Sequence, residues 1–299
     1  MPPPFSPSAE ALAFLADPAN RNTWSYDVSA LPAERAARRV EGEAMRPGIL
    51  ARTGVTLDWQ DVAGIETLVI TPGGWDGSAQ ALYLFGGAFI MGGPIEDLMI
   101  SAALAAQTGL QVLSPAYRLA PEAPFPAGLD DALAVARAMH PRAVIGESAG
   151  GNFAVSVTRA LVEDGTPPAA LALLSPAVDM SPAFDPYDAP DDPTLYPPLV
   201  ADLPGHYAPG TDPFDPRLSP LYCSFSSAWP PCLITTGTRD MFLIQCARLA
   251  RAMREAEAPV NLRVWDSLWH VFEYYPDIPE AAASLAEIAR FLTEVTPSE

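Results

Sequence analysis

The sequence predicts an α/β protein whose mostly parallel central sheet of about eight strands is flanked by helices. From residue 55 onward, short apolar segments alternate with stretches of helical spacing. Regular alternation of this kind specifies a parallel sheet with helices on both faces. The chain has 299 residues and is 49% hydrophobic, which is enough for one large core. We therefore expect a single α/β domain that carries a cap.

The elements follow in order along the chain. Two amphipathic helix candidates, Ala9–Leu15 and Pro32–Val40, lie within the first 50 residues, which show no strand pattern. The expected strands are Val55–Trp59, Glu66–Thr71, Ala81–Phe85, Val112–Ala116, Ala143–Gly146, Ala170–Ser175, Cys232–Thr236 and Asn261–Trp265. The expected helices are 96–107, 127–139, 150–163, 243–256 and 279–294.

Residues 181–220 interrupt this alternation with a Pro- and Asp-rich segment that has the composition of a disordered linker. Its aromatic residues favour an ordered flap instead, and they are Phe184, Tyr187, Tyr196, Tyr207 and Phe214. The acids of this segment lack the glycine and terminal glutamate of a calcium-binding loop. We interpret them as a solvated face, and they are Asp185, Asp188, Asp191 and Asp192.

The composition excludes several function classes. A formal charge of −19, from 36 acidic and 17 basic residues, argues against nucleic acid or an anionic membrane as a partner. All basic residues are arginines, so Schiff-base lysines, pyridoxal phosphate lysines and Walker-type phosphate loops are excluded. Cys223, Cys232 and Cys246 show no CxxC spacing, which speaks against a zinc site or a disulfide framework.

The beginning of the sequence has neither the basic segment nor the long apolar segment of a secretory signal peptide. No run of about 18 apolar residues is present. We expect a cytoplasmic protein that uses no cofactor and no metal, does not associate stably with membranes and acts on a small neutral substrate. A homodimer is left open.

The most informative motif is the GxSxG pentapeptide Gly146–Gly150, which lies between a buried-strand pattern and a helical pattern. Such a turn exposes its serine, here Ser148, in a strained conformation, and the glycines on either side make room for the backbone. The following helix N-terminus favours negative charge. The alternative is an ordinary Gly-rich turn. The strand and helix on either side favour a nucleophile elbow.

A serine nucleophile needs a base, and the sequence contains three histidines. His140 precedes a proline at a helix end, where a cationic side chain complements the helix dipole. His206 lies in the Pro- and Asp-rich segment. His270 follows the last expected strand and is the predicted base.

For the acid that orients this histidine, Asp240 ends a strand pattern beside the elbow, where the sites of α/β proteins gather. Asp266 is the rival, but it lies four residues before His270 on the same loop. The order Ser148, Asp240, His270 is the one expected for hydrolases with a nucleophile elbow.

Acyl transfer also needs donors for the developing oxyanion. The Ala149 amide follows the nucleophile, and Gly86 and Gly87 lie at the end of an expected strand, where they let the backbone approach a substrate. We predict these three amides as the oxyanion hole. The alternative for the glycine pair is a simple turn.

With these residues in place, the sequence resembles the hormone-sensitive-lipase-like esterases of the α/β-hydrolase superfamily, also called bacterial family IV. The most specific likeness is Tyr117–Glu122, which reads YRLAPE, followed by Pro124–Pro126 and Asp130-Asp131. The resemblance covers most of residues 55–295. It implies the α/β-hydrolase fold and assigns Ser148, Asp240 and His270 as catalytic and Gly86, Gly87 and Ala149 as oxyanion donors.

By the same resemblance, residues 1–50 and 181–225 form a cap, and residues 51–180 and 226–299 form the catalytic core. Two positions depart from the family, because its HGGG segment is represented here by Phe85–Ala88. Neither change removes a backbone donor, so we expect catalysis to survive. The predicted substrate-binding residues are Phe5, Trp24, Tyr26, Phe85, Ala88, Phe89, Tyr196 and Phe214.

The resulting hypothesis is a serine carboxylesterase that hydrolyses short- to medium-chain acyl esters through an acyl-enzyme. Two alternatives keep the same triad and change the bond, to a lactone or to an aryl amide such as a formamide. A third is a ligand receptor of the same fold without catalysis, and the histidine at position 270 argues against it.

Overall fold

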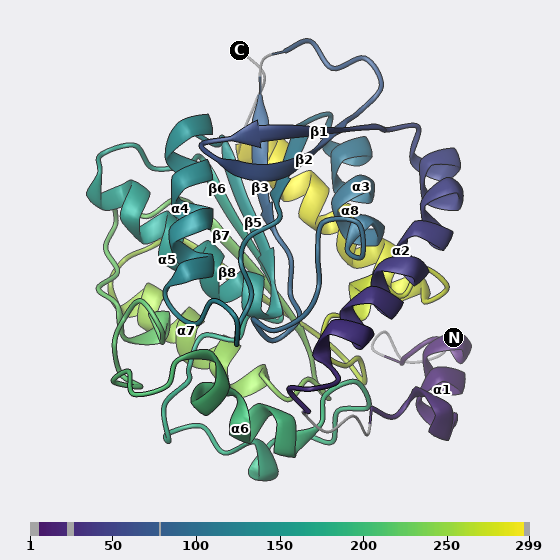
Figure 1. Ribbon diagram of the computed structural model, residues 1–299, viewed down its shortest axis with the longest axis vertical. Coiled ribbons are helices and arrows are strands. Elements are labelled where there is room, and N and C mark those ends of the chain that lie inside the picture. The colour runs from purple at the N-terminus through teal and green to yellow at the C-terminus, as the bar shows by residue number, and fades with distance from the viewer. Residues whose placement is uncertain (1–5, 23–26, 78, 296–299) are drawn as a thin grey trace.

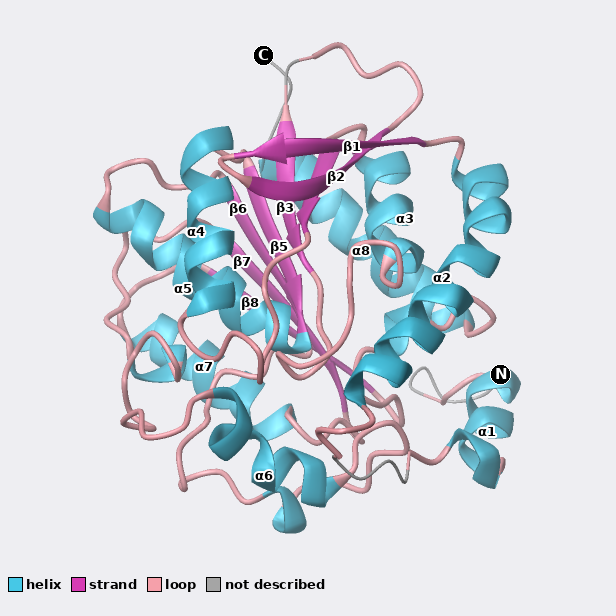
Figure 2. Cartoon of the chain, in the orientation of Figure 1, coloured by secondary structure: helices cyan, strands magenta, loops and turns pink. Residues whose placement is uncertain are grey.

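The computed structural model describes residues 6–22, 27–77 and 79–295 of the chain. One twisted sheet lies in the centre of the molecule, with helices on both faces (Figures 1 and 2). Helices α4, α5 and α7 cover one face, while α3 and α8 pack together on the other. The α/β class and the mostly parallel sheet predicted from the sequence are confirmed.

Within the described residues the sheet has eight strands in the order β1-β2-β4-β3-β5-β6-β7-β8. Strand β2 runs antiparallel to β1 and β4, and the remaining pairs are parallel. The strands are β1 Thr56–Val62, β2 Ile65–Thr71, β3 Gln80–Leu84, β4 Gln111–Pro115, β5 Ala143–Glu147, β6 Ala170–Leu174, β7 Cys232–Gly237 and β8 Val260–Trp265. Each lies within a few residues of its predicted position.

The helices also follow the predictions, with two exceptions. They are α1 Ala9–Ala16, α2 Leu31–Thr53, α3 Leu98–Thr108, α4 Ala127–Met139, α5 Ser148–Glu163, α6 Pro197–Tyr207, α7 Leu243–Glu255 and α8 Pro279–Val295. The prediction Pro32–Val40 is too short, because α2 continues past Pro47 to Gly54, whose left-handed φ of 69° ends it. Helix α6 had no predicted counterpart, although the expected ordered flap is present around it.

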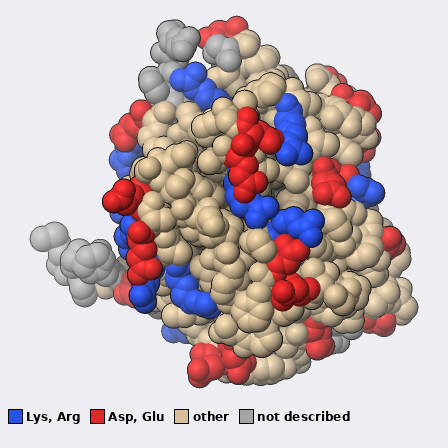
Figure 3. Space-filling model, turned by 90° about the vertical axis from the view of Figure 1, so that its left-hand side faces the viewer, with Lys and Arg blue, Asp and Glu red and all other residues tan. Residues whose placement is uncertain are grey.

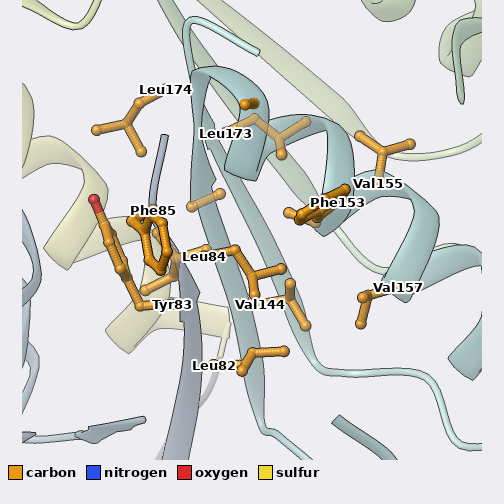
Figure 4. Packing of buried hydrophobic residues seen from close by; sticks show 14 of the residues in the cluster. Leu82, Tyr83, Leu84, Phe85, Val144, Phe153, Val155, Val157, Leu173 and Leu174 are labelled. Atoms are coloured by element: carbon orange, nitrogen blue, oxygen red, sulfur yellow. The ribbon is translucent and has the colours of Figure 1, made fainter. Parts of the chain in front are cut away.

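Buried strands and the helices that cover them form the core. Every residue of β4, β5, β6 and β7 is buried, as expected for interior strands of a parallel sheet. Leu82 and Leu84 of β3, Val144 of β5, and Phe153 and Val157 of α5 belong to one continuous cluster (Figure 4). This packing holds the carboxyl ends of β3 and β5 side by side.

Helix α6 lies beyond the carboxyl ends of the parallel strands (Figure 1). The amino-terminal segment and the segment around α6 are joined by hydrogen bonds. The Asn22 amide donates to the Pro193 carbonyl at 2.7 Å, and Arg21 forms an ion pair with Asp191. Two parts of the chain far apart in sequence therefore meet over one edge of the sheet. Treating them as a cap over a core remains our proposal.

Acidic and basic side chains lie interspersed on the face shown in Figure 3. Several arginines are paired with acids, among them Arg137 with Asp164 and Arg217 with Asp215. Within the part of the chain that is described, no helix is both long and apolar enough to cross a membrane.

Candidate active site

Ser148 lies where β5 ends and α5 begins, and its φ of 51° is one that residues other than glycine rarely adopt. The flanking glycines are sterically required. A Cβ on Gly146 would lie 2.3 Å from the Gly150 carbonyl oxygen, and one on Gly150 would lie 2.0 Å from that of Leu84. The strand, turn and helix thus form an elbow that presents the Ser148 hydroxyl at the end of the sheet.

Three side chains from separate segments form one hydrogen-bonded series. The His270 Nε2 atom lies 2.9 Å from the Ser148 Oγ atom, and the His270 Nδ1 atom lies 3.1 Å from an Asp240 carboxylate oxygen. All three residues are buried. This is the arrangement in which a histidine can take a proton from serine while a carboxylate holds the imidazole.

The surroundings of Asp240 keep it ionised. Burial by itself raises the pKa of this carboxyl, but the charge of His270 and hydrogen bonds from His270, Ser175 and Thr236 lower it to below its ordinary value. The Thr236 hydroxyl donates to one Asp240 carboxylate oxygen at 2.7 Å, and the Phe242 backbone amide donates to the other at 2.8 Å. For His270, burial lowers the pKa, yet the nearby Asp240 charge raises it above the usual range.

The rival candidates lie elsewhere. His140 caps the end of α4, and His206 lies in α6. Asp266 is exposed and accepts a hydrogen bond from Thr238 at 3.3 Å. Of the residues weighed from the sequence, Asp240 and His270 are therefore the ones that the fold brings to Ser148.

The loop after β3 passes beside Ser148 with an unusual backbone. Gly87 has a φ of 109°, and a Cβ there would lie 2.2 Å from the Met91 carbonyl oxygen. Ala88 and Phe89 follow with φ values of 56° and 60°. Three consecutive residues with positive φ therefore form a tight loop.

Glu147 lies directly against this loop. Its carboxylate lies against Gly86, where an added Cβ would approach within 2.1 Å of it. The assignment of the Gly86 amide to the oxyanion hole stays a prediction. Glu147 is buried and supports the loop from below, and burial followed by the charge of Asp97 raises its pKa well above the ordinary value.

Phe85 replaces the histidine of the related HGGG segment without loosening the loop. Its ring stacks on Tyr117, with centroids 4.0 Å apart and planes 7° apart, and the Tyr117 hydroxyl donates to the Phe85 carbonyl. From α2, Arg35 donates to the Ile90 carbonyl at 2.8 Å and to the Ala120 carbonyl at 2.7 Å, and it pairs with Glu122. The Tyr117–Glu122 segment therefore anchors the loop rather than contributing a reacting group.

A cavity of about 270 Å³ opens above Ser148 and His270. Of the predicted substrate-binding residues, Phe85, Ala88 and Phe89 line it. Tyr196 precedes α6 and is not part of the wall. The prediction for Phe214 is wrong, because this ring is exposed and packs on Tyr222. Phe5, Trp24 and Tyr26 lie outside the described residues.

The sequence did not predict that α6 and the residues just before it form part of the cavity wall. Leu195, Leu199 and Leu203 line the cavity together with Val200 and Phe242. Leu199 and Leu203 are four positions apart, which places them on one face of α6, and Leu195 precedes the helix. That spacing was the available signal, but the surrounding prolines masked it.

The interpretation of the four acids near residue 190 as a solvated face is wrong for one of them. Asp192 is 5% exposed and accepts hydrogen bonds from the backbone amides of Met241 and His270. Asp191 is exposed, in agreement with the prediction, and pairs with Arg21. Burial distinguishes two adjacent aspartates that sequence pattern treats alike.

Comparison with known proteins places this geometry in context. Residues 81–274 match a family model described as alpha/beta hydrolase fold. An acetyl-hydrolase from Streptomyces hygroscopicus is 32% identical over 226 residues, covering 72% of this chain and 75% of its own. The crystal structure of an esterase from the bacterial hormone-sensitive lipase family has a TM-score of 0.86 at 28% identity, covering 97% of this chain and 99% of that one. A hormone-sensitive lipase from a metagenome library has a TM-score of 0.84 at 29% identity, with the same coverage.

Proposed function

Because the chain belongs to the α/β hydrolase fold family and is an esterase of its hormone-sensitive-lipase group, we propose that it hydrolyses short- to medium-chain acyl esters through an acyl-enzyme on Ser148. One observation carries the proposal: the hydrogen-bonded series from Asp240 through His270 to Ser148 lies at the base of a mainly apolar cavity. The names of the relatives, acetyl-hydrolase and esterase, point to the same bond.

In the first half of the reaction, His270 takes the proton of the Ser148 hydroxyl while the oxygen attacks the ester carbonyl. Asp240 stabilises the resulting imidazolium and holds its ring in place. His270 then returns the proton to the departing alcohol. In the second half, water attacks the acyl-enzyme with His270 again as the base, and the acid leaves.

The carbonyl oxygen becomes an anion in both halves. We assign its stabilisation to the backbone amides of Gly86, Gly87 and Ala149. Each such donor contributes about 3 kcal/mol to transition-state stabilisation. The N-terminus of α5 adds a favourable dipole at the same place.

The cavity sets the substrate class. A volume of about 270 Å³ lies just below the roughly 300–1,000 Å³ of pockets that hold drug-sized ligands, which favours short acyl groups. The leucines of α6 and Phe242 provide an apolar wall for the alkyl chain.

The test is hydrolysis of p-nitrophenyl acetate, butyrate and octanoate by the purified protein and by Ser148→Ala. We expect turnover by the native chain, a fall of several thousandfold in the variant and a preference for the shorter esters. Equal rates for the two proteins would overturn the proposal. Parallel assays with a lactone and an aryl formamide decide which acyl bond is preferred.

A further inference from the structure

Asp192 lies before α6, far in sequence from both loops that carry the acid and the base, yet its carboxylate contacts both. Its Oδ2 atom accepts from the Met241 amide at 3.1 Å and from the His270 amide at 2.9 Å. Met241 directly follows Asp240. A single oxygen atom therefore fixes the backbone beside each of the two residues that activate Ser148.

The other oxygen of Asp192 faces its own segment. Its Oδ1 atom accepts from the Thr194 amide and hydroxyl, each at 2.8 Å, and from the Leu195 amide at 3.3 Å. The Thr194 hydroxyl also lies 3.4 Å from the His270 carbonyl oxygen. The side chain thus receives donors on both oxygens, which an ionised carboxylate satisfies and an amide side chain does not.

The hydrogen bonds to Asp192 constrain the relative position of the loops that donate them. Asp192 is 5% exposed, so water does not replace a lost partner easily. The separation between the Asp240 carboxylate and the His270 ring, 3.1 Å, depends on how the two loops sit relative to each other. Both loops are held to the same atom, so a shift in either is resisted by the other.

The charged groups that face His270 come from three segments. Asp240 follows β7, Asp192 precedes α6, and Glu273 lies in the turn after His270 itself, and each of the three negative charges raises the pKa of His270 against the effect of burial. Asp192 thus contributes charge as well as geometry. An adjacent exposed acid, Asp191, has neither contact.

We propose that Asp192 is a positioning residue for the hydrolytic reaction. By accepting hydrogen bonds from both loops, it holds the loop of Asp240 and the loop of His270 in a fixed relative position. This inference rests on the proposed esterase function. It also means that the segment before α6, which lines the substrate cavity through Leu195, is tied to the catalytic base by the hydrogen bond from the His270 amide to Asp192. The position of this segment and the geometry of the catalytic triad are then linked.

The kinetic test compares Asp192→Asn with Asp191→Asn as the matched control. The asparagine keeps the shape of the side chain but cannot accept on both sides. We expect kcat for p-nitrophenyl acetate to fall by roughly tenfold or more, because small displacements of reacting groups are costly, while KM changes little. Asp191→Asn should keep the native kcat. Rates are divided by the concentration of active sites, measured by burst titration.

A second measurement does not depend on turnover. The chain has three histidines, so the imidazole signals of His270 can be followed by NMR and assigned by their loss in His270→Gln. We expect Asp192→Asn to lower the pKa of His270 relative to the native chain and to Asp191→Asn. In the rate profile, the acidic limb should move to lower pH in the same variant.

Native kcat per active site and a native His270 pKa in Asp192→Asn would overturn the inference. If that variant does not fold, Asp192→Glu replaces it, because it keeps the charge and displaces the oxygens. It should retain the raised His270 pKa with a reduced kcat, and a native kcat would overturn the inference. If the native protein hydrolysed no ester, the proposed function would fail, while the NMR titration would still decide the role of Asp192.

Discussion

Phe14 of helix α1 stacks on Trp269, the residue before His270, with ring centroids 4.1 Å apart and planes 7° apart. The two residues belong to a small hydrophobic cluster, separate from the main core, that joins the amino-terminal helix to the loop of the catalytic base. The start of the chain therefore supports the site from outside the sheet.

Replacing Phe14 with alanine should weaken this attachment. We expect the free energy of unfolding, measured by urea titration, to fall by about 1–3 kcal/mol, from lost apolar burial and lost ring stacking. The control is Leu12→Ala in the same helix, since Leu12 is 53% exposed and should change stability very little. An equal loss in both variants would contradict the role of the stack.

Two buried tyrosines pack against the loop after β3, and removal of their hydroxyl groups should change stability in different ways. The Tyr117 hydroxyl donates to the Phe85 carbonyl, whereas the Tyr207 hydroxyl has no partner among the described residues, although its ring stacks on Phe89. Tyr117→Phe should cost about 1–3 kcal/mol and lower kcat, because a buried carbonyl loses its donor. Tyr207→Phe should be neutral or stabilising. Thermal unfolding of both variants is the measurement, and similar losses would refute the distinction.

The rate profile should follow the ionisation of His270. The base must be neutral to accept the proton of Ser148, and the charge of Asp240 raises the pKa of His270 despite burial. Activity is therefore low in acid and rises with pH through a midpoint above the ordinary value of about 6.5. A profile of kcat/KM for p-nitrophenyl acetate between about pH 5 and pH 9 checks this. A midpoint at or below about 6.5 would contradict it.

Two buried acids of the cavity wall, Asp97 and Glu147, should make the fold less stable as pH rises. Burial raises the pKa of Asp97 to about 7, and it raises that of Glu147 well above its ordinary value. Both groups bind protons more tightly in the folded chain than in the unfolded chain. Their stabilising effect is therefore complete below about pH 4 and is lost as pH rises through the folded-state pKa values.

Urea titrations between about pH 4 and pH 9 measure this effect. Glu147→Gln should flatten the decline, because a neutral side chain has no proton to lose. Glu122→Gln is the control, since the hydrogen bond from Arg35 lowers the pKa of Glu122. Identical curves for the native chain and Glu147→Gln would rule out a contribution from Glu147.

Chain-length preference should depend on the leucines of α6. Leu203 is buried and lines the cavity, so Leu203→Ala should enlarge it and raise kcat/KM for octanoate relative to acetate esters. A methylene accommodated in an apolar pocket changes selectivity by about 1–3 kcal/mol, or 10- to 200-fold at most. The exposed residue Ile244, changed to alanine, should leave the ratio unaltered. An unchanged ratio in Leu203→Ala would place the acyl chain elsewhere.

Much of the fold could be predicted, because its signals are local. The buried run at Ala143–Glu147 and the helical spacing after Ser148 reflect hydrophobic periodicity, which each segment carries by itself. Helix α6 was missed because its prolines at 197, 198 and 204 suppress the same signal, although the first two fit a helix start. The contact between the Glu147 carboxylate and Gly86 was not predicted, since nothing in the pentapeptide indicates which way that side chain turns.

The sequence by itself determined the class of fold, the elbow at Ser148 and a short set of candidate acids and bases, because strand, turn and helix preferences are encoded within a few neighbouring residues. The tertiary structure alone decided that Asp192 is buried against the triad while Asp191 is in solvent. That difference depends on hydrogen bonds to residues 49 and 78 positions away. The same structure decided which rings line the cavity, since burial is set by packing between distant segments.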